Sequence, residues 1–387
     1  MRTLNVAIIG TKFMGKAHSN AWLNAPHFFD MEIRPVMKVA CGQNEADLQQ
    51  FAERWGWEDT ETDWRKVVER EDVDIVDISV PTYLHHDIAV AAAQAGKHIF
   101  CEKPFAITVD EAREMYEAAR QAGIVHYVNH NYRRCPAVRL AKRLIDDGAV
   151  GQIFHWRGTY LQDWIVDPDF PLTWHLRADR AGAGPHFDLN SHSVDLARYL
   201  VGEINAVTAM TTTFVKERPL PGAGAATFSA GAGGASEMGE VTVDDAAFML
   251  AEFDNGALGS FEASRFAPGR KNFNYFEIYG SQGSIVFNLE RMNELQFFRR
   301  DDPAFAQGFR TILATEGGEH DYVSAWWPPG HMIGYEHEFH HAVVDFMDAI
   351  ANHTPIAPNF YDGLREIEIL TAGLESAATG QKVSTTA

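Results

Sequence analysis

Short apolar runs alternate with helix-forming segments through the first third of this chain, and this alternation is the strongest constraint on its fold. The apolar runs at 4–9, 36–41, 73–81 and 125–129 have the length of strands, and the segments between them have helical spacing. Strands that are separated by helices usually pair in parallel, because each helix carries the chain back to the edge of the sheet at which the previous strand began. The sequence therefore predicts an α/β fold whose N-terminal domain, residues 1–131, is a doubly wound parallel sheet.

The alternation stops after residue 129, and Asn131-Tyr132-Arg133-Arg134 is the predicted hinge into a second domain. From there apolar runs follow one another through short turns, of which Asp254-Asn255-Gly256 is a typical hairpin signal. Successive strands favour a large, mostly antiparallel open sheet, so residues 132–387 are predicted to form an α+β domain for substrate binding and oligomerisation. The expected strands are 153–160, 207–215, 246–253, 256–265, 274–280, 283–288 and 294–299, and the stretch 221–239, rich in Gly, Ala and Ser, is an expected loop. Closing helices at 336–350 and 364–378 belong to this domain or pack back on the first.

The charge balance limits the possible partners. A net charge of -20 disfavours nucleic acids and anionic membranes, since their phosphates would be repelled, and it favours a neutral substrate over a polyanionic one. Cys41, Cys101 and Cys135 show no metal-binding spacing and fit free thiols in a reducing compartment. The sequence has no export signal and no apolar run of about 18 residues. We therefore expect a cytoplasmic protein with neither a nucleic-acid nor a membrane partner.

A glycine turn follows the first predicted strand. Gly10-Thr11-Lys12-Phe13-Met14-Gly15 leads into a helix that runs to about residue 24, and the N–H groups at the start of such a helix bind pyrophosphate in Rossmann domains. Lys12 replaces the second glycine of the dinucleotide fingerprint, so its side chain must turn away from the phosphates or contact them. Where the second strand should end in an acid for the adenosine ribose, the sequence has Gly42 and Gln43. Since no cationic pair is present for a 2′-phosphate, NAD is the favoured cofactor and NADP stays open.

The segment Gly96-Lys97-His98-Ile99-Phe100-Cys101-Glu102-Lys103-Pro104 delivers a lysine to the end of a predicted buried strand. Ligands of open parallel sheets bind at the carboxyl ends of strands, so Lys103 is expected to face the cofactor crevice. A solvent-exposed lysine ahead of a helix is the alternative interpretation.

A second candidate group lies in the second domain. Asp188 and His192 are i and i+4 in a segment predicted to be helical, so both side chains should lie on one face. A carboxylate beside an imidazole orients the ring and stabilises its charged form, which suits a proton acceptor that works near neutral pH. A buried structural pair would have the same spacing.

Together these segments resemble the Gfo/Idh/MocA oxidoreductases, the family of glucose-fructose oxidoreductase and inositol dehydrogenase. The resemblance rests on Gly10 through His18, Ser79-Val80-Pro81 with His85, Gly96 through Pro104, and Asp188 with His192. It implies hydride transfer from a secondary hydroxyl of a neutral sugar, anhydrosugar or inositol to NAD(P), with Lys103 holding the hydroxyl, His192 taking its proton and Asp188 assisting. The implied cofactor contacts are Gly10, Lys12, Phe13, Met14, Gly15, Gly42, Gln43, Ser79, Val80, Pro81, His85, Glu102, Lys103 and Asn131.

Substrate contacts are expected from side chains that offer hydrogen-bonding groups or flat apolar faces, which a polyol requires. Trp164, Ser264-Arg265-Phe266-Ala267 and Trp326-Trp327 further resemble the branch of the family that contains levoglucosan and scyllo-inositol dehydrogenases. The expected substrate contacts are Lys103, Arg133, Tyr160, Gln162, Asp163, Asp188, His192 and His331, with Trp164 and the Trp326-Trp327 pair beside them.

Two other interpretations stay open. His337-Glu338-Phe339-His340-His341 matches the zinc-peptidase pattern H-E-x-x-H, although the residues that follow depart from the extended metzincin pattern, and we expect no metal. A non-catalytic protein that senses a nicotinamide nucleotide would keep the fold without turnover. The exposed face of the antiparallel sheet is the expected surface for a homodimer or homotetramer.

Overall fold

The computed structural model describes residues 2–221 and 237–385, which fold into two compact units. The first unit comprises the described residues up to Arg134 together with Tyr322–Arg365, and the second comprises Cys135–Asp321 and the chain from Glu366 onward. The sequence-based division differs at two points. Its boundary lies a few residues earlier, and its second domain included 322–365, although it left open that the closing helices pack on the first domain.

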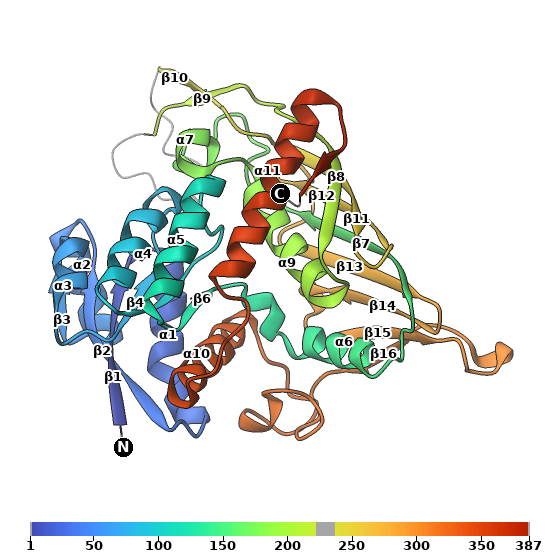
Figure 1. Ribbon diagram of the computed structural model, residues 1–387, viewed down its shortest axis with the longest axis horizontal. Helices are drawn as coiled ribbons and strands as arrows, with labels where there is room; N and C mark the ends of the chain where they lie inside the picture. Colours follow the sequence, from blue (N-terminus) through green and yellow to red (C-terminus); the bar gives the residue numbers. More distant parts are fainter. Residues whose placement is uncertain (1, 222–236, 386–387) are drawn as a thin grey trace. The chain divides into compact units, whose positions relative to one another are not determined.

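The first unit is built on a parallel sheet that reverses its strand order at the first strand, as doubly wound nucleotide-binding sheets do (Figure 1). Its central strands are buried on both faces, which explains their continuous apolar runs. In spatial order the strands are β3 (Asp59–Glu61), β2 (Ile33–Cys41), β1 (Arg2–Ile9), β4 (Ile75–Ile78), β5 (His98–Cys101) and β6 (His126–Val128).

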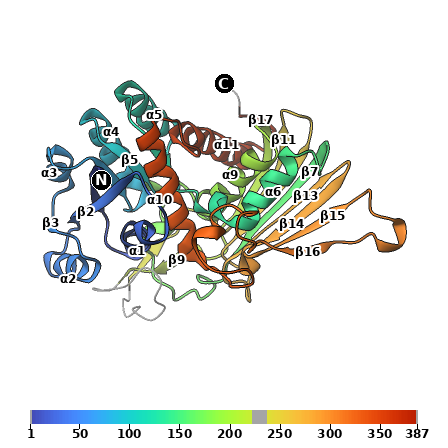
Figure 2. The same ribbon diagram turned by 90° about the horizontal axis from the view of Figure 1, so that it is seen from below.

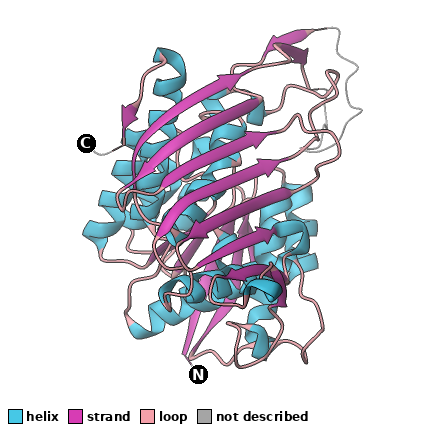
Figure 3. Ribbon diagram, turned by 90° about the vertical axis from the view of Figure 1, so that its right-hand side faces the viewer, coloured by secondary structure: helices cyan, strands magenta, loops and turns pink. Residues whose placement is uncertain are grey.

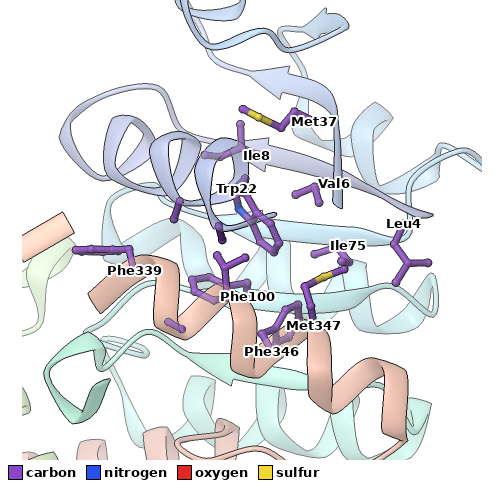
Figure 4. Close-up of a cluster of buried hydrophobic side chains, with 14 of the residues drawn as sticks. Leu4, Val6, Ile8, Trp22, Met37, Ile75, Phe100, Phe339, Phe346 and Met347 are labelled. Atoms are coloured by element: carbon purple, nitrogen blue, oxygen red, sulfur yellow. The ribbon is translucent and has the colours of Figure 1, made fainter. Parts of the chain in front are cut away.

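Helices cover both faces of this sheet (Figure 2). They are α1 (Phe13–Phe28), α2 (Glu45–Trp55), α3 (Trp64–Glu69), α4 (His85–Gln94), α5 (Val109–Ala122), α10 (Tyr335–Asn352) and the first residues of α11 (Phe360–Thr379), with the 3-10 turns η1 (Thr82–Leu84), η2 (Asn131–Arg134) and η6 (Val323–Ala325). Helix α10 packs against α1. Figure 4 shows Phe346 of α10 beside Trp22 of α1 and Phe100 of β5, in the core cluster that joins this late helix to the sheet.

The second unit is built on a nine-stranded sheet (Figure 3). All neighbouring strands are antiparallel except β7 and β12, which run parallel. In spatial order the strands are β16 (Arg310–Leu313), β15 (Glu294–Arg299), β14 (Gly283–Asn288), β13 (Phe273–Gly280), β7 (Ile153–Leu161), β12 (Leu258–Ser264), β11 (Ala246–Phe253), β8 (Ile204–Thr212) and β17 (Val383–Ser384).

Helices of the second unit pack on one face of this sheet, and the alternating burial of β11 shows that the other face carries exposed side chains. The helices are α6 (Pro136–Asp146), α7 (Ala178–Ala181), α8 (Pro185–Asp188), α9 (Asn190–Leu200) and the remainder of α11; the 3-10 turns are η3 (Trp174–Leu176), η4 (Leu289–Arg291) and η5 (Ala304–Ala306). A separate pair, β9 (Glu217–Pro219) with β10 (Met238–Glu240), lies apart from the large sheet.

Several sequence-based expectations need correction. The predicted single helix through Asp188 and His192 is two helices, because the chain makes a turn at Leu189 between α8 and α9. The predicted loop 221–239 is partly strand, since residues 238–239 pair with β9; its residues 222–236 lie outside the described part of the chain. No helix among the described residues is long and apolar enough to cross a membrane.

Candidate active site

The glycine turn between β1 and α1 has no room for larger side chains. Gly10 has a φ of +115°, and a Cβ atom there would lie 2.3 Å from the carbonyl oxygen of Ser79. A Cβ atom on Gly15, in the first turn of α1, would lie 2.2 Å from the carbonyl oxygen of Gly10. Helix α1 also begins without an acidic residue and without a side-chain cap. Its first N–H groups and the positive end of its dipole therefore fit the pyrophosphate of a dinucleotide.

The end of β2 lies beside this turn. The Lys12 ammonium is turned toward α2, where it lies 3.2 Å from the carboxylate of Asp47, and both side chains are exposed. A Cβ atom on Gly42 would lie 3.1 Å from the side chain of Thr11, so a larger residue would crowd the turn. Gln43 is exposed, as are Lys12 and Phe13, while Met14 is half-buried. This part of the predicted cofactor site presents backbone and neutral side chains beside one exposed ion pair.

Residues that follow β4 tie the glycine turn to the turn that carries Lys103. The Ser79 hydroxyl lies 3.2 Å from the carbonyl oxygens of Ile9 and Gly10, to which it can donate. His85 is completely buried, with Nε2 2.9 Å from the carbonyl oxygen of Val80 and Nδ1 3.2 Å from that of Phe105. Burial lowers the pKa of His85, against the effect of its backbone hydrogen bonds. His85 thus shapes the predicted cofactor site by bracing backbone, because none of its surface is exposed.

Glu102 is buried directly before Lys103. Its Oε1 lies 2.8 Å from Nε2 of His18 and accepts a hydrogen bond of 2.6 Å from the Asn129 amide, while its Oε2 accepts the backbone N–H of Lys103 at 3.2 Å. Burial raises the pKa of Glu102, but the hydrogen bond and positive charge of His18 outweigh this effect and leave the pKa below its ordinary value. His18 also contacts Asp77, so a polar network underlies the half-buried Lys103.

Asn131 and Arg133, both in η2, are held by residues from late in the chain. The Asn131 amide donates to Glu338 of α10 at 2.8 Å, and the Arg133 guanidinium lies 3.6 Å from the carboxylate of Asp362 in α11. Both side chains are buried. His331 lies on the exposed loop before α10, with its Nδ1 2.9 Å from the carbonyl oxygen of Pro328.

The zinc-peptidase pattern does not form a ligand pair. Nε2 of His341 accepts the indole N–H of Trp326 at 2.8 Å, so Nδ1 must carry the proton that is donated to the carbonyl oxygen of Arg134 at 2.9 Å. Burial lowers the pKa of His341 to about 3. A metal needs a lone pair, and both ring nitrogens of His341 are already engaged. Across residues 2–221 and 237–385, no group of three His, Cys, Asp or Glu side chains could hold a metal ion.

In the second unit, Asp188 has a partner that the sequence analysis did not assign. Arg265, which follows β12, is 1% exposed and its Nη2 donates to Oδ2 of Asp188 at 2.6 Å. The same guanidinium lies over the ring of Trp164, 5.1 Å from its centroid. His192 is buried in the first turn of α9, with its ring centroid 5.8 Å from that of Tyr160. The predicted acid and base therefore lie among aromatic rings and one buried cation.

Hydrogen bonds join the predicted substrate residues at the end of β7. The Tyr160 hydroxyl donates to Oδ1 of Asn272 at 2.7 Å, and the Gln162 amide donates to the same oxygen at 3.1 Å. Oε1 of Gln162 in turn accepts the Trp164 indole N–H at 2.7 Å. Sheet register explains this meeting, because the last residue of β7, Leu161, is paired with both the end of β12 and the start of β13. Arg265 and Asn272 therefore flank the end of β7.

Asp163 does not bond to Asn272 but to the loop that precedes β13. Its carboxylate pairs with Lys271 at 2.8 Å and accepts the backbone N–H of Gly269 at 3.0 Å; the Lys271 hydrogen bond, followed by that of Gly269, holds its pKa below the ordinary value. Arg265 and Asn272 are the residues to which sequence reasoning gave no role. For Arg265 a signal existed, since it stands in the Ser264-Arg265-Phe266-Ala267 block; for Asn272 the sequence holds none that we can name.

A parallel sheet of this order, with a glycine turn shaped for a pyrophosphate, is typical of a dinucleotide-binding domain. Residues 4–130 match the family model described as the oxidoreductase family, NAD-binding Rossmann fold, and residues 138–286 match the GFO/IDH/MocA C-terminal domain. The chain belongs to the Gfo/Idh/MocA oxidoreductase family.

Two relatives that align over nearly their whole length are dehydrogenases. Levoglucosan dehydrogenase of Pseudarthrobacter phenanthrenivorans is 46% identical over 380 residues, covering 98% of this chain and 97% of the relative. A scyllo-inositol 2-dehydrogenase (NAD(+)) of Bacillus subtilis is 28% identical and covers 90% of this chain and 89% of the relative. Among solved structures, levoglucosan dehydrogenase in complex with NADH and levoglucosan is 44% identical with a TM-score of 0.93, and an oxidoreductase domain protein from Kribbella flavida is 47% identical with a TM-score of 0.94; both cover 100% of each chain. These findings confirm the predicted family, fold class, NAD cofactor and dehydrogenase type of enzyme.

Proposed function

We propose that this enzyme oxidises a secondary hydroxyl of a neutral sugar, anhydrosugar or inositol to a ketone, with an anhydrosugar of the levoglucosan type as the first candidate. The observation that carries this proposal is the 46% identity to a levoglucosan dehydrogenase over nearly the whole of both chains. The polar groups at the end of β7 support it. Tyr160, Gln162 and Asn272 are uncharged hydrogen-bonding side chains beside the flat ring of Trp164, and such groups suit a neutral polyol.

The first unit contains the residues that would hold the cofactor. Gly10 and Gly15 fit a dinucleotide because a Cβ atom at either position would collide with backbone, so the turn lies open to a pyrophosphate. The chemistry that NAD supplies when bound is acceptance of a hydride from the substrate carbon. In the proposed mechanism, the Lys103 ammonium donates to the oxygen of the reacting hydroxyl, which stabilises the negative charge that develops there.

The second unit contains the residues that would move the proton. His192 accepts the hydroxyl proton, and the Asp188 carboxylate supports the charged imidazole. Arg265 holds Asp188 through a charge-assisted hydrogen bond of 2.6 Å. The roles are thus divided among three residues, since Lys103 stabilises the oxygen, His192 takes its proton, and Asp188 orients the acceptor.

The proposed activity is tested by NADH absorbance during incubation of the purified enzyme with NAD and, one at a time, levoglucosan, inositols, L-glucose, D-glucose and glycosides. We expect turnover with a neutral polyol. In the same assay, Lys103→Ala and His192→Asn should each lower kcat by about 10²-fold to 10⁴-fold. Binding of NADH without turnover of any polyol would instead favour the nucleotide-sensing interpretation.

We also propose that the protein forms a homodimer or homotetramer through the outer face of the large sheet. A groove of about 390 Å³ on this face is lined by Met210, Phe248 and Leu250, whose side chains are 75%, 52% and 63% exposed. An apolar patch of this kind on a sheet is typical of a self-complementary interface. Sedimentation of the wild type should show an oligomer, and Leu250→Lys should dissociate it, whereas Phe305→Ser on the exposed turn η5 should not.

A cytoplasmic location is also part of this proposal. All three cysteines are buried and form no disulfide, which fits a reducing compartment. Detection of the tagged protein in cell fractions would test it.

A further inference from the structure

Three buried charged residues form one cluster beneath the Lys103 turn, and no step of the proposed mechanism uses it. This cluster, here called the His18 cluster, consists of His18 on α1, Asp77 in β4 and Glu102 after β5, which are 1%, 0% and 4% exposed. Nδ1 of His18 lies 2.8 Å from Asp77, and Nε2 lies 2.8 Å from Glu102. The Trp22 indole donates to Asp77 at 2.6 Å. Buried charges persist only when they are paired, and each charge of the His18 cluster lies within hydrogen-bond distance of an opposite charge.

The geometry favours a charged imidazole. Each ring nitrogen of His18 faces a carboxylate, and both nitrogens can donate only when the ring carries two protons. Burial lowers the pKa of His18, but the attraction of Asp77 and the hydrogen bonds with Asp77 and Glu102 outweigh it and raise the pKa to about 10. Three uncharged groups of the described chain also contact the ring: Phe100 and Phe339 pack on it with centroids at 5.3 Å and 5.6 Å, and the amide of Asn129 lies 3.2 Å from Nε2.

The cluster connects directly to the backbone of Lys103. One Glu102 oxygen accepts hydrogen bonds from His18 and Asn129, and the other accepts the Lys103 backbone N–H at 3.2 Å. Since Asp77 and Glu102 carry two negative charges against one positive charge on His18, the cluster has a net charge of -1, and Lys103 attracts the Glu102 carboxylate. Loss of the proton on Nε2 would set the lone pair of that nitrogen against Oε1 of Glu102, so Glu102 would keep only its donors from Asn129 and Lys103 and its position would be less fixed.

We propose that His18 is a positioning residue, an imidazolium that fixes the carboxylate of Glu102 and, through it, the backbone turn that aims Lys103. This inference rests on the catalytic role proposed for Lys103. It predicts that His18 affects catalysis only through that lysine, and that its own proton stabilises the folded protein.

The kinetic test compares His18→Gln with His27→Gln, a control at an exposed histidine of the same helix. We expect His18→Gln to lower kcat about tenfold to a hundredfold, because a small misplacement of a catalytic group has effects of this size. NADH affinity, measured by fluorescence titration, should change less than about threefold, since the glycine turn is intact. In a Lys103→Ala background, His18→Gln should cause no further loss of kcat. An unchanged kcat, or losses that multiply in the double variant, would overturn the proposal.

The second test measures the proton and needs no substrate. The pKa of His18 is raised from 6.5 to about 10, so its stabilisation is complete below pH 6.5 and is lost as the pH rises toward 10. Between about pH 7 and pH 8, below the ordinary pKa of thiols, the unfolding equilibrium constant of the wild type should therefore rise with pH more steeply than that of His18→Gln, by nearly a factor of ten per pH unit. Other buried histidines, such as His85 and His341, have lowered pKa values and change the slope in the opposite direction, but they do so equally in both proteins. His27→Gln should have the wild-type slope, and equal slopes in the wild type and His18→Gln would contradict a charged His18.

The two tests separate the inference from the proposed function. If Lys103→Ala keeps full turnover, the role of Lys103 is wrong, whatever His18→Gln does to the pH slope. If Lys103→Ala is inactive and His18→Gln is fully active, the function stands and the positioning role of His18 is wrong.

Discussion

The two units assemble their candidate functional residues in different ways. In the first unit, Gly10, Ser79 and Glu102 each follow a parallel strand, and the sheet places these strand ends side by side. In the second unit, partners meet across long separations, since Asp188 and Arg265 are 77 residues apart and Tyr160 and Asn272 are 112 residues apart. Parallel strands with helical crossovers put every carboxyl end at one edge, whereas an antiparallel sheet brings residues together only through its register.

This difference shows what kind of substitution each site tolerates. The glycine turn is limited by backbone contacts, so even one added methyl group should matter there. The side chains at the end of β7 are held together by hydrogen bonds, so the effect of a substitution there should grow with the number of hydrogen bonds that it removes. Substitutions in the two units can therefore test this contrast.

Among the substitutions that test this contrast, the largest effect is expected from Gly15→Ala. The new Cβ atom would lie 2.2 Å from the carbonyl oxygen of Gly10, so the turn must shift. Overpacking against backbone should cost on the order of 3 kcal/mol of unfolding free energy and weaken NADH binding at least tenfold. Denaturant unfolding and NADH fluorescence titration measure the two effects. Gly308→Ala is the control, because a Cβ atom there meets nothing within 4 Å; equal behaviour of the two variants would remove the steric argument.

Arg265→Met should have the next largest effect, on activity more than on cofactor binding. The substitution deletes the buried cation that holds Asp188, while the shape of the side chain is roughly kept. We expect kcat/KM to fall about tenfold to a hundredfold, with NADH affinity unchanged, because a hydrogen bond between charged groups contributes about 1.5–3 kcal/mol. Arg270→Met, at an exposed arginine of the same segment, is the matched control. Activity equal to that of this control would show that Asp188 does not need Arg265.

The sequence predicted the arrangement of the candidate site residues better in the first unit than in the second. The glycine turn and the Lys103 turn are local patterns, so their position at strand ends followed from the alternation of strands and helices. The strands of the second sheet were also located, with 246–253, 283–288 and 294–299 matching β11, β14 and β15 at both ends. Strand positions do not reveal which strands are neighbours, and therefore Arg265 and Asn272 could not be placed beside β7.

Other features that the sequence analysis did not predict have local causes. Strands β3, β16 and β17 were overlooked because each is short and carries little apolar pattern. The turn at Leu189 was missed because the sequence around it has no glycine or proline that would end α8. The network of His18 could not be foreseen either, since a histidine in a glycine-turn motif gives no sign that Asp77 and Glu102 close on its two nitrogens.

Asn272→Ala should have an intermediate effect. The substitution removes the oxygen that accepts from both Tyr160 and Gln162, while the Asn272 backbone N–H keeps its bond to Glu290. Two donors then lose their fixed direction, so we expect KM for the polyol to rise about tenfold with a smaller change in kcat. Asn352→Ala, at an exposed asparagine, should match the wild type. A KM equal to that of the control would mean that Tyr160 and Gln162 do not depend on Asn272.

The smallest effect is expected from Lys12→Ala, although Lys12 occupies the position of a fingerprint glycine. Its ammonium is turned toward Asp47, and the side chains are 76% and 58% exposed, so the ion pair contributes little in water. We expect the free energy of unfolding to change by less than about 0.5 kcal/mol and the Kd for NADH by less than about threefold at physiological salt. A tenfold weaker Kd that worsens at low salt would show that Lys12 leaves Asp47 and binds the pyrophosphate. In that case the glycine turn would use a side-chain cation as well as backbone, and the contrast between the two units would be weaker than their contacts indicate.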